Sequence, residues 1–118
     1  MNVIERQGNC GLARSIISGV RDFCDSHGRV IVLEDDLLVS SGFLAYMNKA
    51  LEVQDVERVA QVSGYQFPIG FPPGLSDFLP VVTSWGWATW KRAWAHFEER
   101  PDITPLRTVE ESKSETRL

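Results

Sequence analysis

Three consecutive carboxylates, Glu34, Asp35 and Asp36, are the residues whose types and spacing most directly suggest chemistry. They follow the apolar run 30–33, in which three of the four residues are β-branched, a pattern typical of a short strand buried on both faces. Adjacent acids repel one another unless a positive charge lies between them, and a divalent cation with oxygen ligands meets that need. Ligands bind at the carboxyl ends of strands in open α/β sheets. The triplet predicts a cation site, although a solvated acidic turn accounts for the same residues as well.

A second candidate is the turn 7–11, where Asn9 and Gly11 come before an expected helix that contains Arg14. Free backbone N–H groups at the start of a helix attract anions, and an arginine one turn later can bond a phosphate. An exposed surface arginine is the simpler interpretation of Arg14.

The third candidate is the segment 84–94, which contains all four tryptophans. Trp85 and Trp87 flank Gly86, and aromatic faces stack well on sugars or bases. We assign one of these rings, Trp87, to a ligand, while core packing is the alternative for each of them. Ser63, Gly64 and Tyr65 end an expected strand on the same sheet edge as the acids.

Hydrophobic periodicity predicts the elements that position these candidates. Helical spacing predicts a helix that Gly28 ends, on the apolar residues Leu12, Ile16, Val20, Phe23 and Cys24. A second helix presents Phe43, Leu44, Met47 and Leu51, and the run 59–63 reads as a second buried strand. A Pro- and Gly-rich loop covers 65–80, and a third helix is predicted from the spacing of Trp87, Trp90, Trp94 and Phe97. This alternation predicts an α/β fold with a mostly parallel sheet.

Composition narrows the function classes. The net charge of −4 and the scattered positions of the 12 basic residues argue against nucleic acid as the partner. No apolar run approaches the roughly 20 residues that span a bilayer. The two cysteines, Cys10 and Cys24, form no CxxC pattern, so we expect reduced thiols and a cytoplasmic protein. We expect residues 1–100 to form the folded part, a piece of a larger domain, and the polar tail 101–118 to be disordered.

Three segments taken together resemble the GT-A glycosyltransferases, most closely bacterial sugar transferases of the N-acetylglucosaminyltransferase I type. They are residues 9–15, residues 32–37 with 43–47, and residues 85–90, and the resemblance extends over about residues 7–97. It implies a partial GT-A (Rossmann-like) sandwich with a mostly parallel sheet.

The resemblance also implies a reaction, the inverting transfer of a sugar from a nucleotide-sugar donor to a glycan or other hydroxyl acceptor. Mn²⁺ or Mg²⁺ would be bound by Asp36, with Glu34 as a further ligand or near the sugar and Asp35 near the ribose. The nucleotide side would be lined by Asn9, Gly11 and Arg14. The nearest match to the family's general base is Asp77, in the long loop.

Transferases of this type begin with a nucleotide-binding half that these residues do not match. The resemblance therefore implies the missing half of the domain as a partner, and weak donor binding and turnover by this chain alone. The alternative hypothesis is a non-catalytic remnant or interaction module, in which the acids form a solvated turn. A metal-dependent phosphohydrolase fits less well, because such sites gather acids and histidines from several strand ends.

Overall fold

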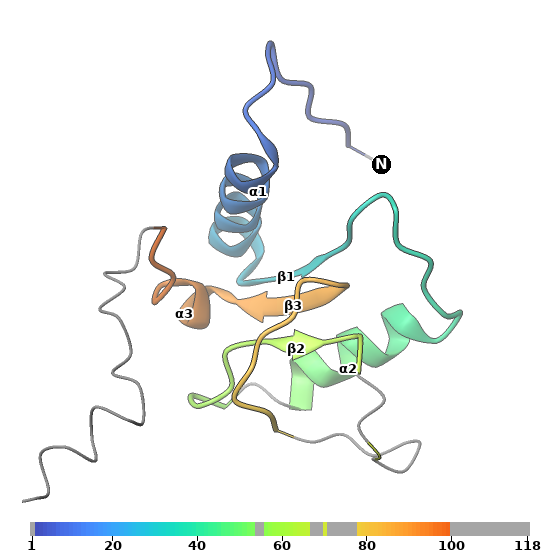
Figure 1. Cartoon of the computed structure of the whole chain (residues 1–118). Helices are drawn as coiled ribbons and strands as arrows, with labels where there is room; N and C mark the ends of the chain where they lie inside the picture. Colours follow the sequence, from blue (N-terminus) through green and yellow to red (C-terminus); the bar gives the residue numbers. More distant parts are fainter. Residues whose placement is uncertain (1, 54–55, 67–69, 71–77, 100–118) are drawn as a thin grey trace, which may run out of the picture.

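The computed structural model describes residues 2–53, 56–66, 70 and 78–99, which form three helices and one three-stranded sheet (Figure 1). In chain order the elements are α1 (Leu12–His27), β1 (Arg29–Val32), α2 (Phe43–Val53), β2 (Val62–Ser63), β3 (Trp87–Trp90) and α3 (Lys91–Trp94). Within these residues, no helix combines the length and hydropathy that crossing a bilayer requires. The expected tail 101–118 and most of the expected loop lie outside the described residues.

The helix α1 forms where the periodicity predicted it and ends as predicted, although Leu12 and Phe23 of the predicted apolar face are exposed. Gly28 adopts the left-handed conformation, with φ of 79°, and its N–H donates to the carbonyl of Cys24 at 2.8 Å. Glycine accepts this conformation without the steric cost that a Cβ brings. The chain therefore turns sharply after α1 and enters β1 in the next residue.

The sheet corrects the predicted fold class. Its strand order is β1-β3-β2, and β3 pairs antiparallel with both neighbours. The expected mostly parallel sheet, and with it the partial GT-A (Rossmann-like) sandwich, is therefore wrong for the described residues. Because β1 and β2 are both antiparallel to β3, they run in the same direction, but β3 separates them.

The reason for the error lies in residues 87–97, which the sequence predicted as one helix. Residues 87–90 form β3 and only 91–94 are helical. All four residues of β3 are buried, because the strand has a hydrogen-bonded neighbour on each side and helices on both faces. The second expected strand, 59–63, is also shorter, with only Val62 and Ser63 in β2.

Two apolar clusters hold the helices on opposite faces of the sheet. One joins α2 to the strands through Phe43, Met47, Ala50, Leu51, Val62, Ala88 and Trp90, with Ile31 packed against it. The other joins α1 to the sheet through Val20, Cys24 and Trp87, with Val30 and Val32 packed against it. Successive residues of β1 thus contact opposite clusters, as the two-residue repeat of a strand requires. The strand has apolar neighbours on both faces, although Val30, Ile31 and Val32 are only half-buried.

Candidate functional site

The strand register brings three chain segments to one edge of the sheet. Val32, the last residue of β1, lies opposite Trp87, the first residue of β3, and Ser63, the last residue of β2, lies opposite the same Trp87. The residues that follow β1 and β2 and those that precede β3 therefore meet at this edge. The expected convergence of the acids with Ser63, Gly64 and Tyr65 is confirmed at the level of the backbone, despite the antiparallel sheet.

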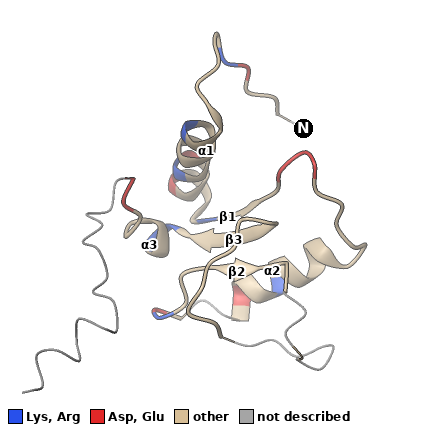
Figure 2. Ribbon diagram, viewed as in Figure 1, with Lys and Arg blue, Asp and Glu red and all other residues tan. Residues whose placement is uncertain are grey.

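The acidic triplet lies at this edge in a turn that follows β1 (Figure 2). Glu34 is half-buried, while Asp35 and Asp36 are exposed, and the N–H of Leu37 donates to the carbonyl of Glu34 at 3.4 Å. The ion pairs found among the described residues, Lys49–Glu52 and Lys91–Asp25, involve none of the three. Three adjacent negative charges thus lie without a protein cation between them, which leaves them able to attract a cation from solution.

Two glycines shape the edge of the sheet where β2 ends and β3 begins. The N–H of Gly64 donates to the carbonyl of Gly86 at 2.7 Å, which extends the pairing of β2 and β3 by one step. The Phe43 ring packs over both residues, and a Cβ on Gly86 would lie 3.1 Å from this ring and 3.4 Å from Leu33. Gly86 also has φ of 67°, a conformation that residues with side chains rarely adopt. The first helical turn of α2 therefore fixes the ends of β2 and β3 only because both positions lack side chains.

The Ser63 hydroxyl holds the chain as it leaves β2. Its Oγ accepts from the N–H of Tyr65 at 3.1 Å, donates to the Tyr65 carbonyl at 2.8 Å, and lies 2.5 Å from the Oγ1 of Thr83. These contacts fix Tyr65 beside Trp85, where the two rings meet edge to face with centroids 5.0 Å apart. Both rings remain accessible, with 40% of Tyr65 and 49% of Trp85 exposed. The edge at which β1 and β2 end therefore also presents an exposed aromatic pair.

Of the flanking tryptophans, Trp85 rather than Trp87 is the exposed one. The structure places Trp87 in the cluster under α1, 9% exposed, with its ring centroid 6.1 Å from that of Trp94. The sequence analysis considered both Trp85 and Trp87, because they flank Gly86, and assigned the ligand contact to Trp87. Once 87–90 is a strand, the residue before Gly86 is the one that reaches the edge.

The nucleotide-side candidates lie at the start of α1. The side-chain Oδ1 of Asn9 accepts from the N–H of Gly11 at 2.8 Å, and Gly11 has φ of 79° just before the helix. Arg14 is exposed on the first turn. Because α1 ends at Gly28, next to β1, its first turn is the end of the helix remote from that junction (Figure 1). No hydrogen bond or ion pair among the described residues connects Asn9, Gly11 or Arg14 with the acidic turn.

The acidic turn is suited to a cation that takes part of its coordination from a bound ligand, rather than to a cation bound by protein side chains alone. In the part of the chain that the structure describes, no three His, Cys, Asp or Glu residues form a group able to hold a metal ion. Protein sites that hold Mg²⁺ or Mn²⁺ through only one or two carboxylates take the remaining ligands from phosphate oxygens and water. The residues fit the implied cation when a phosphate-bearing ligand is bound with it. Asp77, the candidate general base, lies outside the described residues.

Comparisons of this chain with protein-family models, with curated proteins and with solved structures give no significant match.

Proposed function

We propose that this chain contributes the cation- and diphosphate-binding edge of a glycosyltransferase that moves a sugar from a nucleotide-sugar donor to an acceptor hydroxyl. The observation that carries the proposal is that the acidic turn follows β1 at the same edge of the sheet where Tyr65 follows β2 and Trp85 precedes β3. A nucleotide-sugar presents two chemical features, a diphosphate and a sugar ring. Carboxylates that share a cation suit the first, and exposed aromatic rings suit the second.

In this proposal Asp36 and Glu34 hold the cation, and their arrangement supports different roles. Asp36 is exposed and free of protein cations among the described residues, so it can reach an ion in solvent. Glu34 is half-buried at the end of β1, so its carboxylate is more restricted and better suited to orienting the ligand. A bound Mn²⁺ or Mg²⁺ would supply Lewis-acid stabilisation of the charge that develops on the leaving nucleoside diphosphate.

The other residues bind and orient. Asp35 is exposed next to the proposed ligands and can accept hydrogen bonds from ribose hydroxyls. Asn9, Gly11 and Arg14 are proposed to contact the nucleotide from the start of α1, where backbone N–H groups and a guanidinium favour anions. Trp85 and Tyr65 are proposed to stack on a sugar ring. An acceptor hydroxyl that attacks the anomeric carbon must lose its proton to a base, and Asp77 is the proposed base.

One observation favours a second candidate function, an interaction module without catalysis. The structure has a groove along the outer edge of β1, lined by residues of α1, β1 and α2 and not by the acidic turn. A chain whose role is assembly would use such a groove and leave the acids solvated.

A titration of the full chain with Mn²⁺, with and without UDP or GDP, separates the two functions. Tryptophan fluorescence is the readout, because Trp85 lies at the proposed edge. The transferase proposal predicts Mn²⁺-dependent nucleotide binding that Asp36→Asn weakens at least about tenfold, since a direct ligand contributes strongly to affinity. The matched control is Asp22→Asn, which removes the same charge from an exposed position on α1 and should leave binding unchanged. Equal responses of the two variants, or no nucleotide binding at all, would refute the proposal and favour the interaction module.

A further inference from the structure

The outer edge of β1 has backbone groups that no described segment pairs. The N–H of Lys91 donates to the carbonyl of Gly28 at 2.8 Å, so Gly28 faces β3. In an antiparallel pair, the N–H and C=O of one residue both point toward the neighbouring strand, and those of the next residue both point away from it. Val30 and Val32 therefore bond β3, whereas Arg29 and Ile31 direct their N–H and C=O groups away from it. No hydrogen bond from another described segment reaches these outward groups, as befits the edge position of β1.

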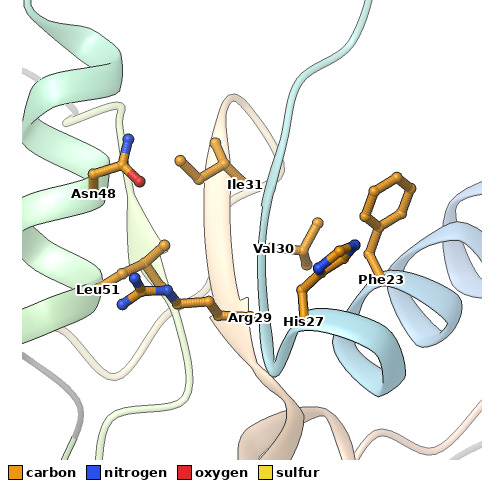
Figure 3. Close-up of a pocket in the computed structure, with 7 residues that line it drawn as sticks. All are labelled: Phe23, His27, Arg29, Val30, Ile31, Asn48 and Leu51. Carbon is orange, nitrogen blue, oxygen red and sulfur yellow. The ribbon is translucent and has the colours of Figure 1, made fainter. Parts of the chain in front are cut away.

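A groove of about 420 Å³ runs along this edge (Figure 3). In Figure 3, β1 lies between the two helices, with Phe23 and His27 of α1 on one side and Asn48 and Leu51 of α2 on the other. Phe23, Val30, Ile31 and Leu51 give it an apolar lining, and its ionisable groups are Arg29 and His27. A groove with apolar walls and a row of free peptide groups at its base suits an extended strand.

We propose that the strand that occupies this groove is β1 of a second copy, paired antiparallel about a two-fold axis at Ile31. Ile31 of each copy then faces Ile31 of the other, and Arg29 faces Leu33. This register matches the outward peptide groups of the two copies. Side chains of directly paired residues point to the same face of a sheet. In this register Val30 pairs with Val32, so the α1 helices of both copies lie on the same face of the joint sheet. The result is a continuous sheet of six strands.

The charges at the two ends of β1 favour a second copy in this orientation. Arg29 and His27 lie at the start of the strand, and the acidic turn 34–36 follows its end. Antiparallel pairing brings the acidic turn of one copy toward Arg29 and His27 of the other, whereas parallel pairing would bring like charges together. Opposite charges in this arrangement select orientation as well as adding attraction. The proposal does not depend on the proposed function.

Sedimentation velocity of the full chain over a wide concentration range, in buffer with EDTA, tests the proposal. Wild type should form a dimer reversibly. Arg29→Glu should weaken the dimer at least about tenfold, because it puts like charges across the interface, and Arg29→Glu combined with Asp35→Lys should recover most of the loss. Arg58→Glu is the matched control, since it makes the same charge change at an exposed position in the turn before β2, on the other side of the sheet. It should leave the dimer unchanged.

Residue-resolved amide hydrogen exchange locates the contact independently of the variants. The Val30 N–H bonds β3 and should be protected at every concentration, whereas the Ile31 N–H should become protected only as the dimer forms. The proposal is overturned by a monomer at all concentrations, or by a dimer that Arg29→Glu does not affect. Ile31 protection that is independent of concentration would also overturn it, because another segment of the same chain would then cover the edge.

Discussion

Gly64 and Gly86 lie opposite each other where β2 and β3 end, joined by an N–H···O bond of 2.7 Å and covered by the ring of Phe43. Gly64 and Gly86 are the chain neighbours of Tyr65 and Trp85, so this contact with α2 sets where the aromatic pair lies relative to the sheet. The candidate site therefore depends on two positions that have no side chain.

Gly64→Ala is expected to destabilise the fold by about 1–3 kcal/mol, the usual cost of forcing extra atoms into a packed core. Its Cβ would meet the Phe43 ring and lie 3.0 Å from the Gly86 carbonyl oxygen, so both neighbours would have to move. Urea unfolding measures the change. Gly42→Ala is the control, because a Cβ there has no neighbour within 4 Å, and its effect should stay within about 0.5 kcal/mol. Equal stability of both variants would show that the glycine contact does not hold the edge.

The two glycines of the α1 region should respond to alanine in opposite directions. Gly28→Ala is expected to cost about 1–2 kcal/mol, because residue 28 has φ of 79° and a Cβ is strained there. Gly19→Ala should instead stabilise by about 0.5–1 kcal/mol, since Gly19 lies inside α1 and a Cβ would meet nothing within 4 Å. Thermal unfolding of the two variants is the measurement. A loss of stability in both would mean that Gly19 is closely packed.

The ionisation of Cys24 should lower the stability of the fold in alkaline solution. Burial raises the pKa of its thiol above the ordinary value of 9.0, the charge of Asp25 acts in the same direction, and Lys91 opposes both. The unfolded chain therefore loses the proton at a lower pH than the folded chain does. It follows that the free energy of unfolding decreases as the pH rises past the ordinary thiol value.

The measurement for Cys24 is the urea midpoint as a function of pH, from neutral to alkaline. Cys24→Ala should have a shallower alkaline decline than wild type, whatever its absolute stability. Cys10→Ala is the control, because Cys10 is an exposed free thiol and its removal should leave the slope unchanged. Parallel curves for wild type and Cys24→Ala would contradict the assigned burial.

Trp85 should report ligand binding at the acidic edge. Trp85→Phe keeps an aromatic ring next to Tyr65 but removes the exposed indole, so we expect the fluorescence change caused by Mn²⁺ and UDP to be largely lost. Trp94→Phe should retain the change, since Trp94 lies on α3 and packs against Trp87 and Phe97. If Trp94→Phe loses the signal and Trp85→Phe keeps it, the ligand binds elsewhere.

Local sequence patterns predicted the elements whose structure depends on nearby residues. The helices α1 and α2, the end of α1 at Gly28 and the strand at the β-branched run are confirmed. The predicted apolar faces are confirmed only in part, because Leu12, Phe23 and Leu44 are exposed. Gly28 is informative because a glycine that directly follows a helical repeat commonly takes the left-handed conformation that ends a helix.

The sequence failed at β3, where the structure depends on distant residues. Trp87, Trp90 and Trp94 are spaced as on a helix, yet Trp87 packs under α1 while Ala88 and Trp90 pack under α2. A central strand that is apolar on both faces shows no alternation, so its period cannot be read from the sequence. This failure made the sheet appear parallel. The edge position of the acids was still predicted correctly, because β1 and β2 run in the same direction.

The acidic turn must bind a divalent cation together with a nucleoside diphosphate if this chain is to hold a nucleotide-sugar donor. Paramagnetic broadening of amide NMR signals by substoichiometric Mn²⁺, with UDP present, tests it most directly because the broadening depends on distance from the ion. We predict UDP-dependent loss of the Asp35, Asp36 and Leu37 signals, followed by those of Tyr65 and Trp85, and no such loss in Asp36→Asn. Broadening that UDP does not change, or that is as strong at Asp22 and Glu52 as at the acidic turn, would contradict the account.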